Sequence, residues 1–157
     1  MSKKILLVED EAILAMSEAQ MIQKHGYEVV TAHKGEKAVE IIEEDPEISL
    51  ILMDIDLGKG MDGTEAAQKI REKHEIPIVF LTSHSEKDYV DRVKKITRYG
   101  YVLKNSGEFV LIESINMAFE LFESHQQTKK SEKQYREFVE NSNEGIWKID
   151  SDGVTRF

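Results

Sequence analysis

The chain has 157 residues, of which 40% are hydrophobic, and this length suffices for one ordinary globular domain with some additional chain. Its 30 acidic residues against 21 basic ones give a formal net charge of -9, which argues against direct binding to nucleic acid. Cysteine is absent, so disulfides, thiolate metal sites and thiol nucleophiles are excluded.

Five short apolar runs of strand length lie along the chain, at residues 5–8, 27–32, 50–53, 78–81 and 101–103. Three of them are continuously apolar, without the alternation of a half-exposed strand. Continuous apolar character indicates burial on both faces, which is typical of central strands in a parallel sheet covered by helices.

Stretches of helical periodicity separate these runs, and each has one apolar face to bury. They cover residues 12–22, 37–42, 66–70 and 89–96, and a stretch without proline or glycine from residue 108 to about 138 predicts a further, extended helix. Gly26 and Asp45-Pro46 are suited to ending helices, and Pro77 to opening the fourth strand. The pattern predicts a doubly wound α/β domain with helices on both faces of a parallel sheet.

Polar residues follow the predicted strands, and in a doubly wound sheet these positions converge on one rim where ligands bind. The residues are Glu9, Asp10, Asp54, Asp56, Thr82, Ser83 and Lys104. Carboxylates crowded at one rim repel one another unless a cation lies among them, and Mg²⁺ suits a small oxygen-lined site. A carboxylate there can act as a nucleophile toward phosphorus, with hydroxyl and ammonium groups offsetting charge on the phosphoryl oxygens.

Five motifs, in order along the chain, resemble those of the receiver domain of two-component response regulators. They are Leu7-Val8-Glu9-Asp10-Glu11, Leu52-Met53-Asp54-Ile55-Asp56, Met61-Asp62-Gly63, Leu81-Thr82-Ser83 and Tyr99-Gly100-Tyr101-Val102-Leu103-Lys104. The resemblance covers about the first four fifths of the chain. It implies a CheY-like, flavodoxin-like fold: a five-stranded parallel sheet in the order 2-1-3-4-5, with an extended C-terminal helix.

The resemblance also implies a role for each matching position. Asp54 would be the phosphoacceptor, taking a phosphoryl group from the phosphohistidine of a histidine kinase or phosphotransfer protein. Asp10 and Asp54 would bind Mg²⁺ directly, Asp56 through its backbone carbonyl and Glu9 through a water molecule. Lys104 would bond the phosphoryl group.

Thr82 and Tyr101 match the two switch positions of the family. Thr82 would move toward the phosphoryl group, and the ring of Tyr101 would fill the space left behind. The altered surface would comprise the predicted helix at 89–96, the strand at 101–103 and the helix that follows. Simple packing of Tyr101 is an alternative interpretation of the same residue.

Two features depart from the family pattern. Asn105 follows Lys104 where the family usually has a proline, commonly in a cis bond, so we expect a trans bond here. The loop after Asp54 is one residue longer than usual and contains Gly58 and Gly60, which predicts a more mobile rim.

Two other functions compete with the receiver interpretation. Asp54 and Asp56 also resemble the DxD motif of haloacid-dehalogenase-type phosphatases, in which both side chains act. That family places the motif on its first strand, whereas here an acidic pair and two predicted strands precede it. A degenerate receiver that binds a partner without phosphorylation is the other alternative, and the intact carboxylate set argues against it.

The sequence divides into a receiver domain at residues 1–126, a polar helical linker at 127–136, and a segment at 137–157 that resembles the opening of a PAS domain. We expect the chain to end within that domain and to belong to a longer signalling protein, such as a sensor histidine kinase, with PAS and kinase domains downstream. The receiver itself would then have only self-phosphorylation and dephosphorylation activity.

A symmetric dimer through the fourth and fifth helices or through the linker is expected. No apolar stretch is long enough to cross a bilayer, and a cytoplasmic location is predicted.

Overall fold

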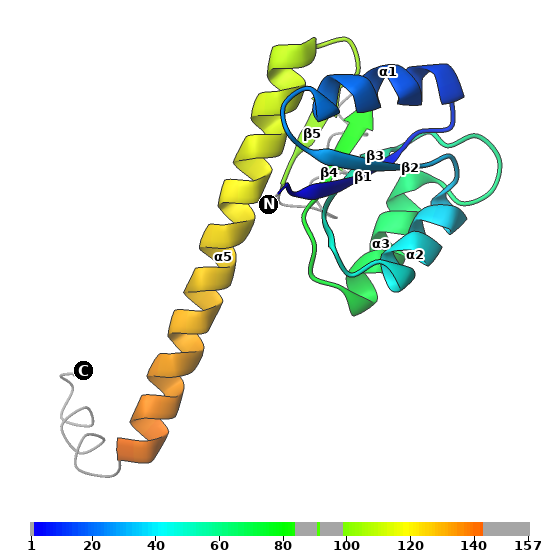
Figure 1. The fold of residues 1–157 in the computed structure, drawn as a ribbon. Helices are drawn as coiled ribbons and strands as arrows, with labels where there is room; N and C mark the ends of the chain where they lie inside the picture. The colour runs from blue at the N-terminus through cyan, green and yellow to red at the C-terminus, as the bar shows by residue number, and fades with distance from the viewer. Residues whose placement is uncertain (1, 84–90, 92–98, 143–157) are drawn as a thin grey trace. The chain divides into compact units, whose positions relative to one another are not determined.

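The computed structural model describes residues 2–83, 91 and 99–142, with side chains described as far as residue 136 (Figure 1). The strands are β1 (Lys4–Val8), β2 (Glu28–Ala32), β3 (Ile48–Asp54), β4 (Ile78–Thr82) and β5 (Tyr101–Leu103). The helices are α1 (Ala12–Gln23), α2 (Gly35–Glu44), α3 (Gly63–Lys73) and α5 (Glu108–Ser142). The helix predicted at 89–96 lies outside the described residues, apart from Asp91.

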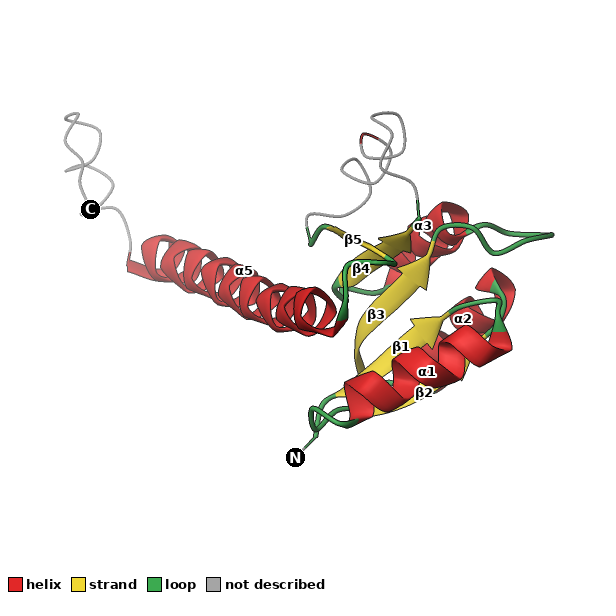
Figure 2. Cartoon of the chain, turned by 90° about the horizontal axis from the view of Figure 1, so that it is seen from above, coloured by secondary structure: helices red, strands yellow, loops and turns green. Residues whose placement is uncertain are grey.

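All five strands are parallel and lie in the order β2-β1-β3-β4-β5, which confirms the predicted doubly wound, flavodoxin-like sheet (Figure 2). The central strands β1, β3 and β4 are almost fully buried. This burial explains why their sequences are continuously apolar, since helices cover both of their faces.

Helices cover the sheet on two sides, and each side has its own apolar core. On one side, α2 and α3 pack on the sheet through residues such as Ala38, Ala66 and Ile70. On the other side, α1 and the first turns of α5 pack through residues such as Ile22 and Ile115. Side chains alternate between these two cores along each strand, as the pleat requires.

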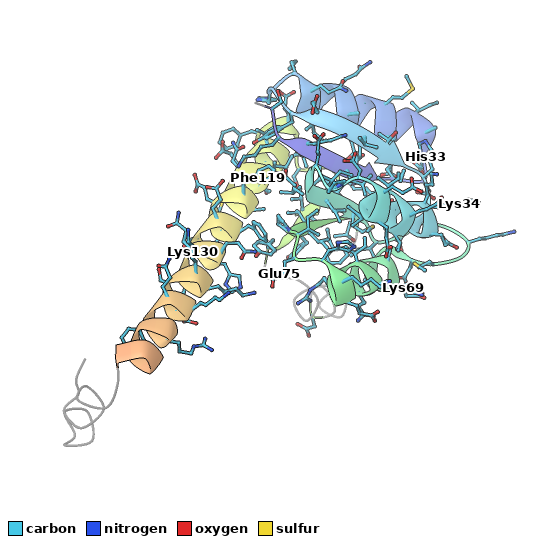
Figure 3. All side chains as sticks on the ribbon, turned by 60° about the horizontal axis from the view of Figure 1, so that its bottom comes forward. His33, Lys34, Lys69, Glu75, Phe119 and Lys130 are labelled. Carbon is cyan, nitrogen blue, oxygen red and sulfur yellow. The ribbon has the colours of Figure 1, made fainter. Side chains whose placement is uncertain are left out.

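The first part of α5 is held by contacts with the segment that enters β2. Phe119 of α5, labelled in Figure 3, stacks on Tyr27 with ring centroids 5.8 Å apart. The Tyr27 hydroxyl also donates a hydrogen bond to the Asn116 side chain. Lys3 completes this contact with its ammonium 4.2 Å from the Phe119 ring centroid.

The chain divides into two compact units, Met1–Phe122 and Glu123–Phe157. In the second unit, residues 123–142 continue as helix, and the side chains at 127–136, where the linker was predicted, are exposed. Most of the segment that resembles a PAS domain, residues 143–157, lies outside the described residues. Among the described helices, none combines the length and apolar character needed to cross a membrane.

Candidate functional site

The predicted site residues meet at one edge of the sheet. Glu9 and Asp10 follow β1, Asp54 is the last residue of β3, Thr82 is the last residue of β4, and Lys104 follows β5. Because β1, β3, β4 and β5 are adjacent and parallel, their carboxyl ends place these residues side by side. The sequence-based prediction of a common rim is therefore confirmed.

Lys104 bridges two buried carboxylates. Its Nζ donates a hydrogen bond to Asp54 Oδ2 at 2.9 Å and forms an ion pair with Glu9 Oε1 at the same distance. Both acidic residues are buried, with 0% of Glu9 and 1% of Asp54 exposed. The backbone N–H of Lys104 donates to the carbonyl of Thr82 at 2.9 Å, which fixes the start of the loop that carries the ammonium.

Backbone donors orient the two buried carboxylates. The N–H of Asp56 donates to Asp54 Oδ1 at 3.1 Å, and the N–H of Glu11 donates to Glu9 Oε2 at 3.2 Å. Each carboxylate therefore has one oxygen toward a backbone donor and the other toward Lys104. This arrangement fixes the Asp54 carboxylate within the cluster.

The protonation of the cluster reflects burial opposed by one ammonium. Burial raises the pKa of Asp54 to about 8, with Lys104 opposing the shift and Glu9 adding to it. Burial is also the largest influence on Glu9 and favours a higher pKa, but hydrogen bonds with Lys104, Asp54, the backbone of Glu11 and Asp10 together outweigh it, so the pKa of Glu9 is lowered. Burial followed by the neighbouring Glu9 raises the pKa of Asp10. One ammonium thus does not neutralise all three carboxyl groups.

The geometry fits a hard divalent cation. Glu9, Asp10 and Asp54 each offer a carboxylate oxygen, and these oxygens lie within 4.8 Å of one another. Oxygen ligands of this kind and number suit Mg²⁺, which keeps several of its own waters. The side chain of Asp56 is exposed and is not part of this group. Coordination by the Asp56 carbonyl and by a water on Glu9 stays a prediction.

The two predicted switch residues lie on neighbouring strands. Thr82 is buried, with 2% exposed, and Tyr101 is half-buried against the core on the α2–α3 side. Phe80, two residues before Thr82, is in register with Tyr101 and belongs to the same core. Alternation along β4 therefore directs Thr82 and Tyr101 to the same side of the sheet. Their movement on phosphorylation stays a prediction.

The model of the response regulator receiver domain family matches residues 5–116, which is more than two thirds of the chain. The chain belongs to this family. The fold and the acidic rim described above are those expected for such a receiver domain.

Individual relatives support the same assignment. The receiver is 36% identical over 122 residues to the transcriptional regulatory protein PdtaR of Mycobacterium tuberculosis, and the match covers 76% of this chain and 58% of PdtaR. The chain thus spans little more than half the length of this curated relative.

Two solved receivers are also similar. The N-terminal domain of a response regulator/sensory box/GGDEF 3-domain protein from Carboxydothermus hydrogenoformans is 46% identical, with a TM-score of 0.73 over 78% of this chain and 98% of that one. The BeF3-activated receiver domain of Klebsiella pneumoniae RstA is 29% identical, with a TM-score of 0.69 over 74% and 97% of the two chains.

Glycines shape the loop that follows β3 of the receiver. Gly58 and Gly60 have φ of 72° and 92°, a region that favours glycine. At Gly63, the first residue of α3, a Cβ would lie 2.0 Å from the backbone oxygen of Asp54. The absence of a side chain there lets α3 begin directly against the end of β3. Greater mobility of this loop stays a prediction.

The Lys104–Asn105 bond is trans, as predicted from the absence of proline, because the described backbone contains no cis peptide bond. The connection after Lys104 is closed by a turn in which Ser106 N–H donates to the carbonyl of Leu103 at 3.1 Å. The chain therefore returns into α5 without the proline that is usual in this family.

Two further residues near the site were not predicted from the sequence. His33, labelled in Figure 3, contacts the backbone oxygen of Glu9 through Nδ1 at 2.9 Å, linking the β2–α2 connection to the acidic pair. Glu18 is a buried acid on α1. A charged residue at a position of α1 that the helical period assigns to the apolar face was the available signal for Glu18.

Proposed function

We propose that the receiver accepts a phosphoryl group from a phosphohistidine onto Asp54. The observation that carries the proposal is the position of the Asp54 carboxylate, buried at the end of β3 and held between Lys104 and the acidic pair. This arrangement provides a nucleophile, an ammonium for the phosphoryl oxygens, and carboxylate oxygens suited to Mg²⁺.

In the proposed transfer, an Asp54 carboxylate oxygen forms a bond to phosphorus while the phosphorus–nitrogen bond of the phosphohistidine breaks. The electron pair of that bond returns to the imidazole nitrogen, so no oxidant or further reactant is required. The ammonium of Lys104, now paired with Asp54, is placed to pair instead with an oxygen of the transferred group. Mg²⁺ bound by Asp10, Asp54 and Glu9 would neutralise charge on the same oxygens.

The protonation of Asp54 explains why a cation is needed for this chemistry. Burial raises the pKa of Asp54, and a carboxyl group that holds its proton is a poor nucleophile. A divalent cation among the three carboxylates favours their ionised forms and supplies the missing positive charge. The cluster is therefore organised for metal-dependent modification.

The phosphatase alternative has weaker support in this geometry. In the dehalogenase-type mechanism both acidic side chains act on the substrate. Here the side chain of Asp56 is exposed, while its backbone N–H bonds Asp54. A phosphoacceptor role for Asp54 alone accounts for this arrangement more simply.

Phosphorylation of Asp54 would be read out through Thr82 and Tyr101, which share one side of the sheet, and would alter the surface around β5 and α5. We propose that residues 127–136 act as a helical linker to a PAS domain that begins near residue 137. The similar Carboxydothermus hydrogenoformans receiver comes from a protein described as containing a sensory box, which supports this organisation. Histidine kinase domains further downstream and a cytoplasmic location are parts of the same proposal.

A symmetric homodimer is proposed through the α5 surface. Met117 and Leu121 lie one turn apart on α5 and are 58% and 50% exposed, which leaves apolar surface for a second copy. Sedimentation velocity on the chain and on Leu121→Glu tests this. A dimer that persists unchanged in Leu121→Glu would place the contact elsewhere.

The phosphoacceptor proposal is tested by incubating the protein with Mg²⁺ and acetyl phosphate and measuring its intact mass. The wild type should gain the mass of one phosphoryl group, and Asp54→Asn should gain none. Asp56→Asn is the matched control and should still be modified, since the substitution keeps the backbone N–H that bonds Asp54. Modification of Asp54→Asn, or its absence in the wild type, would overturn the proposal.

A further inference from the structure

Glu18 is a buried carboxyl group that phosphoryl transfer does not use. It lies on α1, is 7% exposed, and its Oε1 has no hydrogen-bond partner among the described residues. Burying a carboxyl oxygen without a partner costs free energy, and such groups in folded proteins usually have a partner that is yet to be identified.

A cavity of about 110 Å³ adjoins Glu18. Its walls are mostly aliphatic and come from four elements, with Leu14 and Met21 on α1, Leu81 on β4, Val102 on β5 and Leu111 on α5. Ser17, which also lines the cavity, is exposed to solvent. The cavity is therefore accessible from solution, and it combines an apolar lining with one buried acid.

The charges around the cavity favour a cation. Lys104 also lines it, but its ammonium is already shared between Asp54 and Glu9. Burial, and then repulsion by Glu9, raise the pKa of Glu18 to about 7, and attraction to Lys104 offsets only part of this. Two charged groups face Glu18, namely Glu9 after β1 and Lys104 after β5. They leave the Glu18 carboxylate without an adequate counter-charge.

We propose that this cavity binds a small alkylammonium ion, with the ammonium on the Glu18 carboxylate and the alkyl chain against the leucines. The volume is suitable, because an apolar cavity of about 150 Å³ accepts benzene and this one is somewhat smaller. A straight chain of roughly four carbons fills such a space and leaves the charged end for the carboxylate. The proposal concerns a second site, separate from the carboxylates at the phosphoacceptor.

The experiment is an NMR titration of the ¹⁵N-labelled protein with n-butylammonium chloride at about pH 8, where Glu18 is mostly ionised. Sodium chloride at matched ionic strength and n-butanol are the references. Saturable shifts are expected for amides of α1, β5 and the start of α5, and only with the amine. In the wild type the affinity should fall about tenfold between pH 8 and pH 6, as protonation removes the carboxylate.

Two variants separate this site from the acidic rim. Glu18→Gln keeps the size of the side chain and should weaken binding at least about tenfold at pH 8, whereas Asp10→Asn should leave binding unchanged. Shifts that do not saturate, equal shifts with n-butanol, or full affinity in Glu18→Gln would overturn the proposal. Loss of binding in Asp10→Asn would do the same, because it would place the amine on the phosphoacceptor carboxylates. The pH series in the wild type gives the same test without a mutation.

Discussion

Asp54 and Glu18 are both buried acids with raised pKa values, but their surroundings differ. Asp54 has Lys104 on one carboxylate oxygen and a backbone N–H on the other, within a group of carboxylates at the open edge of the sheet. Glu18 has a carboxyl oxygen without a partner among the described residues, beside an aliphatic cavity. Both acids are thus similarly buried. Asp54 lies in a cluster whose partners can be exchanged, whereas one carboxyl oxygen of Glu18 still lacks a partner among the described residues.

Removing the Lys104 ammonium should have the largest effect on stability, because Glu9 and Asp54 lose the cation that they share. Lys104→Met leaves Glu9 and Asp54 buried without their cation, and should lower the free energy of unfolding by about 3 to 5 kcal/mol in the absence of Mg²⁺. Urea denaturation followed by circular dichroism measures this. Lys73→Met, which breaks the exposed pair with Glu43, is the control and should change little. Equal effects of the two substitutions would contradict the account.

The packing below Asp54 should come next in size. In Gly63→Ala the new Cβ would meet the Asp54 backbone oxygen at 2.0 Å, so α3 or the end of β3 must shift, at a cost of about 2 to 3 kcal/mol. The shift should also slow modification by acetyl phosphate. Gly26→Ala is the comparison: its φ of 93° is strained for alanine, but apart from its chain neighbours no atom of the described residues lies within 4 Å of the new Cβ, so the loss should be nearer 1 kcal/mol.

Neutralising Glu18 should stabilise the protein, in the opposite direction to Lys104→Met. The pKa of Glu18 is raised to about 7 from an ordinary value of 4.5, so the folded state binds the proton more tightly than the unfolded state. The contribution of Glu18 to stability is thus most favourable below about pH 4.5 and is lost as the pH rises toward 7. Glu18→Gln should gain about 2 kcal/mol at pH 8 and little at pH 5. A gain in stability that does not depend on pH would contradict this explanation.

The smallest effect on stability is expected at Asp62, a carboxylate with ordinary hydrogen bonds. It serves as a reference for Asp54 and Glu18. Asp62 caps α3 by accepting from Glu65 N–H at 2.9 Å, and Asp62→Ala should cost about 1 kcal/mol in thermal or urea unfolding. Glu11 occupies the same position before α1 without a side-chain capping bond, so Glu11→Ala should cost less. The reverse order would show that capping does not determine these values.

Most of the fold could be predicted from the sequence because buried strands have continuously apolar sequences. All five strands were predicted to within two residues at each end, and the rim residues followed from the strand ends. The Met61-Asp62-Gly63 motif, noted only for its resemblance to the family, supplies the capping residue of α3 and a position without room for a side chain. These features depend on local sequence and on one topological rule.

The remaining features depend on contacts between distant segments. That Lys104 pairs with both Asp54 and Glu9 depends on how β1, β3 and β5 end relative to one another, which a motif does not specify. The cavity beside Glu18 is formed by α1, β4, β5 and α5 jointly, so inspection of α1 alone reveals only an acid on an apolar face. Cavity volumes and unpaired buried atoms are determined by how distant segments pack, and they have no short sequence signature.

The location of the phosphoryl group tests most directly whether Asp54 is the phosphoacceptor. The protein is incubated with Mg²⁺ and acetyl phosphate, reduced with borohydride, which converts a phosphorylated aspartate to homoserine, and mapped by peptide mass spectrometry. We expect homoserine at position 54 and at no other acidic position of the rim. Homoserine at position 10 or 56, with residue 54 unchanged, would contradict it.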